Sequence, residues 1–380
     1  MESSFYVPVH VYCGEGAVRA HAKDLKALGK KAFVVTGAHS AVECGVYSDI
    51  CAALNEAGMS HVWFHEVEQN PSVSTVMRAR DTALEEKCDC VIGAGGGSPL
   101  DAAKAVALMM RHKDEGPGFL YASGSDNSAV PVALVPTTCG TGSEVTGVSI
   151  LTVPEQEKKG SIPHKIFADL ALVDGTYLMG ASGRILLNTS LDALAHLFES
   201  YMSSAASKLS RMIADEGMKV WGENLQFLSE LAVSEKRPEL TAGRADSLML
   251  ASMLGGMAIA QTGTSLPHAL SYYVTVKLGV EHGRAVNYFM PGYLKAAGMA
   301  GAAYRADMLH LMEQSGIGSV EEFRRLYDKA CGPLSSDEQK LKEILKMDAA
   351  GMEKNTAKLR SVPFTVDSRM LEQIVFDAFI

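Results

Sequence analysis

The stretch CDCVIGAGGGSPLDAAKAVALMM, residues 88–110, decides the fold of the first half of this 380-residue chain. Residues 89–94 form a short apolar run that ends in glycines, which is typical of a buried parallel strand. The apolar positions after Pro99 repeat with helical period. The stretch therefore predicts a strand, a tight turn and a helix, with Ser98 as the cap and Pro99 as the first helical residue.

The turn between this strand and helix has the chemistry of a phosphate site. Its glycines can adopt positive φ and let a ligand approach the backbone, while the helix N-terminus attracts negative charge. We therefore expect a pyrophosphate to be held by Gly95, Gly96, Gly97 and Ser98. Asp101 either contacts the cofactor or serves only as a capping residue, and Lys104 can reach a phosphate or ribose oxygen. The spacing matches neither the six-residue dinucleotide fingerprint nor a Walker loop.

A second polar loop lies in ALVPTTCGTGSEVTGVSIL, residues 133–151. Another apolar strand runs into Pro136, and hydroxyl side chains then crowd between glycines. Such a loop can bind a ribose or phosphate through its backbone and side chains, although alone it is only a loop rich in turn formers. The candidate residues are Thr137, Thr138, Thr141 and Ser143.

Four side chains further along the chain suit one divalent metal ion. Asp192 and His196 in SLDALAHLFESY are four residues apart, so both project from one face of a predicted helix. His268 and His282 are separated by a stretch long enough for a short helix and a turn. Each histidine alone is more often a half-buried, hydrogen-bonded residue, and an i, i+4 Asp–His pair also stabilises a helix slightly. Together with the phosphate loop, the set favours a zinc or iron(II) site.

The organisation of the chain changes near residue 180. Before it, β-rich runs such as 32–36 and 89–95 alternate with helical stretches such as 43–57 and 73–86, the pattern of βαβ units. After it, nearly every stretch has helical period, including a single predicted helix over 206–229. We expect an α/β, Rossmann-like nucleotide-binding domain with a mostly parallel sheet at 1–180, followed by an all-helical metal-binding domain at 181–380.

Composition agrees with a cytoplasmic enzyme. The formal charge of −9 argues against nucleic acid or an anionic membrane surface as a partner. Seven cysteines without a C-x-x-C pair indicate reduced thiols. The N-terminal residues have no basic region followed by an apolar stretch, and no apolar run is long enough to span a membrane, so we expect neither a signal peptide nor a membrane helix.

Together these stretches resemble the iron-containing alcohol dehydrogenase family over essentially the whole chain. The matching pieces, in the family's order and spacing, are CGEGA (13–17), GGGSPLDAAKA (95–105), PTTCGTGSEVT (136–146), DALAHLFESY (192–201) and EHGRAV (281–286). The resemblance implies the architecture shared with dehydroquinate synthase and a homo-oligomer, expected as a dimer. It also implies Asp192, His196, His268 and His282 as ligands of iron(II), with zinc as the alternative.

The resemblance also implies roles for the cofactor loops. Gly95–Ser98 would hold the pyrophosphate, and the hydroxyls of residues 137–143 would line the nicotinamide side. Lys158 stands where a family lysine contacts the cofactor ribose, with Lys159 adjacent.

Two positions depart from the family pattern. Many members have a second histidine four residues after the third ligand, often assigned to proton relay, and here that position is Tyr272. Members that use NAD usually carry an aspartate after the first nucleotide-domain strand, where this chain has Gly37. Gly37, His39 and Ser40 instead form a small polar pocket that can take a 2′-phosphate. The sequence therefore predicts NADP, with NAD as the alternative.

The function predicted from the sequence is hydride transfer between NAD(P) and a small primary alcohol, diol or aldehyde, with the metal as Lewis acid. One rival is a lyase of the dehydroquinate synthase type, which needs Lys and Arg around the metal to hold anionic substrate groups. The segments around Asp192, His268 and His282 are apolar apart from Arg284. The other rival is a catalytically silent nucleotide-binding protein, which Tyr272 leaves open.

Overall fold

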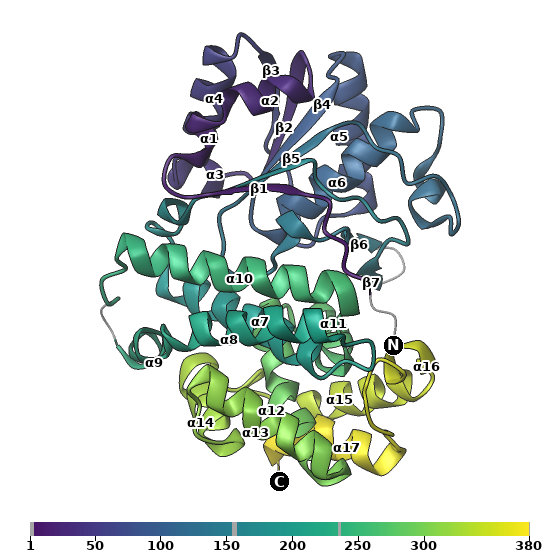
Figure 1. Cartoon of the computed structure of the whole chain (residues 1–380). Coiled ribbons are helices and arrows are strands. Elements are labelled where there is room, and N and C mark those ends of the chain that lie inside the picture. The colour runs from purple at the N-terminus through teal and green to yellow at the C-terminus, as the bar shows by residue number, and fades with distance from the viewer. Residues whose placement is uncertain (1–3, 154–157, 235–236, 380) are drawn as a thin grey trace. The chain divides into compact units, whose positions relative to one another are not determined.

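A computed structural model describes residues 4–153, 158–234 and 237–379 of the chain (Figure 1). The chain divides into two compact units. One unit comprises Tyr6–Ala181 together with Thr241–Met249, and the other is formed mainly by Ser182–Leu240 and Leu250–Ile380. The expected fold class is confirmed, because the first unit is built on a parallel sheet and the second is helical.

The first unit contains a six-stranded parallel sheet in the order β1-β8-β5-β4-β2-β3. A separate antiparallel pair, β6 and β7, lies outside this sheet. The strands are β1 (His10–Cys13), β2 (Lys31–Thr36), β3 (Ser60–Phe64), β4 (Cys90–Gly95), β5 (Val132–Pro136), β6 (Ile150–Val153), β7 (Lys158–Ser161) and β8 (Leu170–Val173). The α-helices are α1 (Ala17–Ala20), α2 (Ala22–Leu28), α3 (Ser40–Glu43), α4 (Val46–Glu56), α5 (Val73–Glu85) and α6 (Gly97–Arg111), and the 3₁₀ turns are η1 (Pro117–Tyr121), η2 (Ser143–Val145) and η4 (Gly175–Leu178).

Both faces of the central strands β2, β4, β5 and β8 are buried, and alternate residues of each strand point to opposite faces. Phe33, Val91 and Leu134 pack with residues of α5 and α6 in one core. Ala32 and Val34 pack with residues of α1, α2 and α4 in the other. Covering on both faces explains why the strands are continuous apolar runs.

The start of α6 differs from the expectation. The helix begins at Gly97 and its N-cap is Gly96 in an extended conformation, so the predictions of Ser98 as cap and Pro99 as first residue are wrong. The Ser98 hydroxyl instead accepts a hydrogen bond from the backbone N–H of Asn70, at 3.1 Å. A contact with a distant loop outweighs the local capping preference.

The second unit is helical, as expected. Its helices are α7 (Gly183–Tyr201), α8 (Lys208–Gly222), α9 (Leu225–Val233), α10 (Ala242–Thr262), α11 (Leu266–Leu278), α12 (His282–Ala300), α13 (Ala302–Ser315), α14 (Val320–Cys331), α15 (Glu338–Glu353), α16 (Thr356–Leu359) and α17 (Ser368–Phe376), with a 3₁₀ turn η5 (Asp377–Phe379). The first residues of α10 belong to the other unit. The single helix predicted over 206–229 is two helices. Across the described residues, no helix is long and apolar enough to cross a membrane.

Candidate metal centre and nucleotide loops

Helix α7 places Asp192 and His196 one turn apart on the same face. The helix starts at a serine cap, where the Ser182 hydroxyl accepts from the Ile185 N–H at 3.2 Å. From residue 190 onward the helix is buried along its whole length. Asp192 and His196 are therefore almost fully enclosed, at 3% and 5% exposure.

Helices α11 and α12 bring the other two histidines to the same place. His268 lies in the first turn of α11, and Gly279 ends that helix in the left-handed conformation (φ 65°), which favours glycine. Three residues later α12 begins at His282. Nε2 of His268 lies 3.5 Å, and Nε2 of His282 3.9 Å, from Oδ1 of Asp192. The rings of His196 and His268 stack with centroids 4.5 Å apart.

These atoms have the properties of a metal site. Donor atoms of Asp192, His196 and His268 lie within 4.8 Å of one another. Oδ1 of Asp192 and Nε2 of His268 are buried, and neither has a hydrogen-bond partner among the described residues. A buried polar atom without a partner is costly, and a divalent ion would satisfy both atoms at once. Three imidazoles and one carboxylate are a donor set that suits zinc or iron(II).

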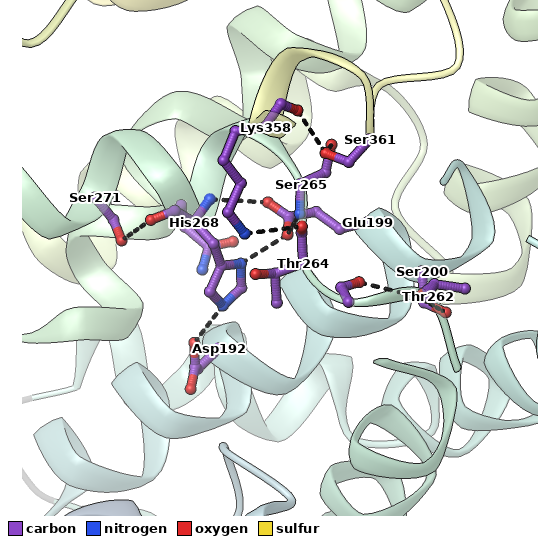
Figure 2. A network of polar contacts seen from close by, with 12 residues as sticks. Asp192, Glu199, Ser200, Thr262, Thr264, Ser265, His268, Ser271, Lys358 and Ser361 are labelled. Carbon is purple, nitrogen blue, oxygen red and sulfur yellow. Dashed lines mark hydrogen bonds and ion pairs between the residues drawn. The ribbon is translucent and has the colours of Figure 1, made fainter. Parts of the chain in front are cut away.

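Glu199 fixes the orientation of His268 (Figure 2). Its carboxylate accepts from His268 Nδ1 at 2.8 Å and from the backbone N–H groups of His268 and Ser265 at 2.9 and 2.8 Å. Because Nδ1 donates its proton to Glu199, Nε2 faces Asp192 and would offer its lone pair to a metal that displaces the second ring proton. Ser271 similarly lies 3.4 Å from Nδ1 of His282.

The carboxylates and histidines of the centre stabilise each other's charged forms. Burial raises the pKa of Asp192, but His196 and His282 outweigh it and hold the pKa below its ordinary value. Burial likewise raises the pKa of Glu199, and His268 reverses the direction. For His268, burial lowers the pKa while Glu199 raises it to about 9. Both carboxylates are therefore ionised at neutral pH.

Substituting Glu199→Gln is expected to weaken metal binding about 10- to 100-fold, the usual cost of losing an outer partner of a ligating histidine. The amide keeps an acceptor for His268 but removes the negative charge. Competition with a metal-binding dye measures the affinity. Glu216→Gln, an exposed carboxylate on α8, is the matched control. Unchanged affinity in the Glu199 variant would contradict the orienting role.

Sequence reasoning missed two residues near this centre. Glu199 follows Asp192 and His196 at helical spacing, so the period of α7 could have revealed it. Lys358 could not have been found this way, since it lies far along the chain. Its Nζ donates to the carbonyl of Thr264, just before α11, at 3.3 Å (Figure 2). Lys358 therefore lies near the ligands in addition to Arg284, the one cation of the segments around Asp192, His268 and His282. Tyr272 stacks on His282 with centroids 5.8 Å apart.

In the first unit, the two candidate nucleotide loops lie side by side. They follow β4 and β5, which pair in parallel with Gly95 opposite Pro136. The Thr137 N–H donates to the Gly95 carbonyl at 2.9 Å. A Cβ atom at Gly97 would lie 2.7 Å from Cγ2 of Thr141, and one at Gly96 would lie 3.2 Å from Cγ2 of Thr138. Glycine is therefore needed at Gly97 for this close approach, and at Gly95 for its φ of 144°.

Asp101, Ser143 and Lys104 face one another beneath these loops. The Ser143 hydroxyl donates to Asp101 at 2.6 Å, and Asp101 also accepts from the Ile150 N–H. Lys104 is fully buried and donates to Ser143 and to backbone carbonyls, including that of Val148. Burial lowers its pKa against the opposing effect of Asp101. Because Lys104 is held by these contacts, they do not support the prediction that it reaches a phosphate. Asp101 and Ser143 bind each other, which favours a role in positioning the two loops.

The predicted ribose-binding residues follow β2. The order of the sheet reverses between β2 and β4, because the chain runs from β2 to one edge of the sheet and from β4 toward the other. Ligands of such sheets bind at the carboxyl ends of the strands there. Gly37 directly follows β2, and His39 and Ser40 are exposed. Lys158 begins β7, but its side chain lies outside the described part of the chain.

Comparisons with known proteins cover both units. The family model described as iron-containing alcohol dehydrogenase matches residues 8–175, and that of the C-terminal part of the same family matches residues 186–356. Sulfoacetaldehyde reductase of Bilophila wadsworthia is 31% identical over 322 residues, 83% of this chain and 81% of that protein. NAD-dependent methanol dehydrogenase of Bacillus methanolicus is 28% identical over 293 residues, 76% and 74% of the two chains. An iron-containing alcohol dehydrogenase structure from Thermotoga maritima matches with a TM-score of 0.87 and 32% identity over 99% of both chains.

Proposed function

The chain belongs to the iron-containing alcohol dehydrogenase family, and we propose that Asp192, His196, His268 and His282 bind its metal ion. It is an oxidoreductase that interconverts alcohols and aldehydes with a nicotinamide cofactor. One observation carries the ligand assignment. Asp192 Oδ1 and His268 Nε2 are buried side by side without a hydrogen bond, as two donors to a shared ion would be.

Each group then has a distinct part in catalysis. When bound, iron(II) or zinc supplies Lewis acidity that polarises a carbonyl oxygen or lowers the pKa of an alcohol. Glu199 keeps His268 in the tautomer that presents Nε2 to Asp192. The glycine loop holds the pyrophosphate with backbone N–H groups at the start of α6. Hydride transfer is the chemistry of the cofactor, and the protein aligns C4 of the ring with the substrate carbon.

The experiment that tests this function is turnover of reduced nicotinamide with short linear aldehydes. Purified protein supplied with iron(II) should oxidise NADPH when aldehyde is added, and a small primary alcohol or diol should support the reverse reaction. A chelator should abolish turnover and added metal should restore it, because the ion is the Lewis acid. Absence of turnover with every aldehyde would favour the silent nucleotide-binding protein.

We propose that the preferred nucleotide is NADP, because no carboxylate follows β2. An aspartate after this strand accepts hydrogen bonds from both ribose hydroxyls of NAD and repels a 2′-phosphate. Gly37 does neither, and the exposed His39, Ser40 and nearby backbone N–H groups supply donors for a phosphate. The relatives include an enzyme named for NAD. The proposed preference for NADP therefore rests on Gly37 and not on family membership.

Substituting Gly37→Asp is expected to reverse a preference for NADPH that we place at about 10- to 100-fold, or roughly 1–3 kcal/mol. A Cβ at Gly37 would meet its nearest neighbour, the Val67 carbonyl, at 3.6 Å, an ordinary contact, so the side chain fits. The measurement is kcat/KM for NADPH and NADH at one ionic strength, with Gly37→Ala as the uncharged control. A ratio that the aspartate leaves unmoved would assign the ribose to another loop.

We further propose that the enzyme is a cytoplasmic homodimer that acts on small primary alcohols, diols or aldehydes. None of the seven cysteines forms a disulfide bond in the described structure, which supports a reducing compartment. Light scattering after gel filtration would test the dimer. The relatives' names range from methanol to sulfoacetaldehyde, so family membership does not fix the charge of the substrate.

A further inference from the structure

Lys358 is a cation that tertiary structure brings to the metal centre. It lies in α16, which packs against α11, and Figure 2 shows its side chain extending toward the Glu199–His268 pair. Its Nζ donates to the Thr264 carbonyl at 3.3 Å, and the side chain is half-buried. The next residue, Ser265, donates its N–H to Glu199, which in turn accepts from His268. Three successive contacts therefore connect the ammonium group to a proposed metal ligand.

The segment that carries Lys358 is anchored to this place. The Ser361 hydroxyl donates to the Lys358 carbonyl at 2.6 Å and lies 3.3 Å from the Ser265 hydroxyl. Ser204, just beyond α7, binds the carbonyls of Arg360 and Ser361. Both the backbone of Lys358 and its Nζ are thus held in place.

Two buried carboxylates and one cationic side chain lie at the centre. Asp192 and Glu199 are two buried carboxylates, and together they balance one divalent ion. Lys358 adds a further positive charge on the Glu199 side of His268. A charge near buried side chains acts strongly on a ligand there, because the surroundings screen it poorly. An ammonium group binds carboxylate and sulfonate oxygens through charge-assisted hydrogen bonds.

We propose that Lys358 selects substrates that carry an anionic group, a carboxylate or a sulfonate, a few carbon atoms from the reacting aldehyde or alcohol. The inference rests on the proposed function, since it places the reacting oxygen at the metal. Lys358 is a specificity-determining residue in this scheme, because its charge attracts one end of the substrate while the metal receives the other. A neutral aldehyde of the same length gains nothing from it.

The test compares each anionic aldehyde with a neutral aldehyde of equal chain length, for example succinic semialdehyde with butanal. Wild-type protein should favour the anionic substrate at least about tenfold in kcat/KM. Lys358→Met should lower kcat/KM for the anionic substrate about 10- to 100-fold and for the neutral one less than about threefold. Lys358→Arg should keep the preference. Lys342→Met, an exposed lysine of α15, is the control.

Two results would overturn the proposal. Wild-type preference for the neutral aldehyde is one. The other is a parallel loss with both substrates in Lys358→Met together with weaker metal binding, since that would show that the lysine only secures the α10–α11 turn.

A binding measurement separates this proposal from the proposed function. Calorimetry of metal-loaded protein with isethionate, set against its neutral counterpart 1-propanol, requires no turnover. Isethionate binding that Lys358→Met abolishes would support the anion site even if no aldehyde were reduced. Equal binding in both proteins would reject it.

Discussion

His196→Ala and His282→Ala proteins are expected to lose their metal and their activity together. Wild-type protein should hold about one divalent ion per chain. Each variant should hold a small fraction of that, because deleting one of the four proposed ligands leaves too few donors. Turnover should fall more than about a hundredfold, since even an outer partner of a ligand is worth roughly 10- to 100-fold. Elemental analysis of the purified proteins and initial rates measure both effects.

A matched control histidine, His310, lies in the same unit. His310 pairs with Asp215 at 2.6 Å and stacks on Tyr201, so it is a half-buried histidine with a carboxylate partner outside the proposed site. His310→Ala should keep the full metal content and activity. Circular dichroism would show whether each variant is folded. Undiminished metal in folded His196→Ala and His282→Ala proteins would exclude the site.

Gly96→Val is expected to abolish tight nucleotide binding while leaving the fold intact. Gly96 has φ −74° and ψ −171°, which a branched residue adopts without strain, so the backbone tolerates the change. Its side chain would press on Thr138 and fill the space where a pyrophosphate approaches the start of α6. We expect the Kd for NADPH to rise about a hundredfold or more, roughly 2.7 kcal/mol or more of binding free energy.

The matched control is Gly116→Val. Gly116 also lies before a helical turn in an extended conformation, with φ −86° and ψ 178°, and a Cβ there would meet nothing within 4 Å. Fluorescence titration with NADPH and thermal unfolding should show wild-type values for the control. If Gly96→Val also titrates like wild type, the nucleotide binds elsewhere.

Much of the fold and of the candidate site could be predicted because the signals are local. The strand–turn–helix of residues 90–111 follows from an apolar run, three glycines and a helical period. Asp192 and His196 share a face of α7 because four residues make about one turn. The break between α8 and α9 lacked such a signal, so the sequence predicted a single helix over 206–229.

Other features depend on segments that are distant in the chain. Ser98 was predicted to cap α6, yet its hydroxyl binds Asn70, because a neighbouring loop offers an N–H that local preference cannot foresee. Asp101 and Ser143 bind each other 42 residues apart, so their part in the nucleotide site is set by packing.

The sequence by itself determined the fold class, the phosphate loop and the set of metal-ligand candidates. Periodicity, turn chemistry and residue type are properties of neighbours along the chain. The tertiary structure alone decided which nitrogen of His268 faces Asp192, since Glu199 fixes the tautomer. It also decided that Lys358 stands beside that pair. Contacts between remote segments follow from how helices pack, and no local pattern encodes them.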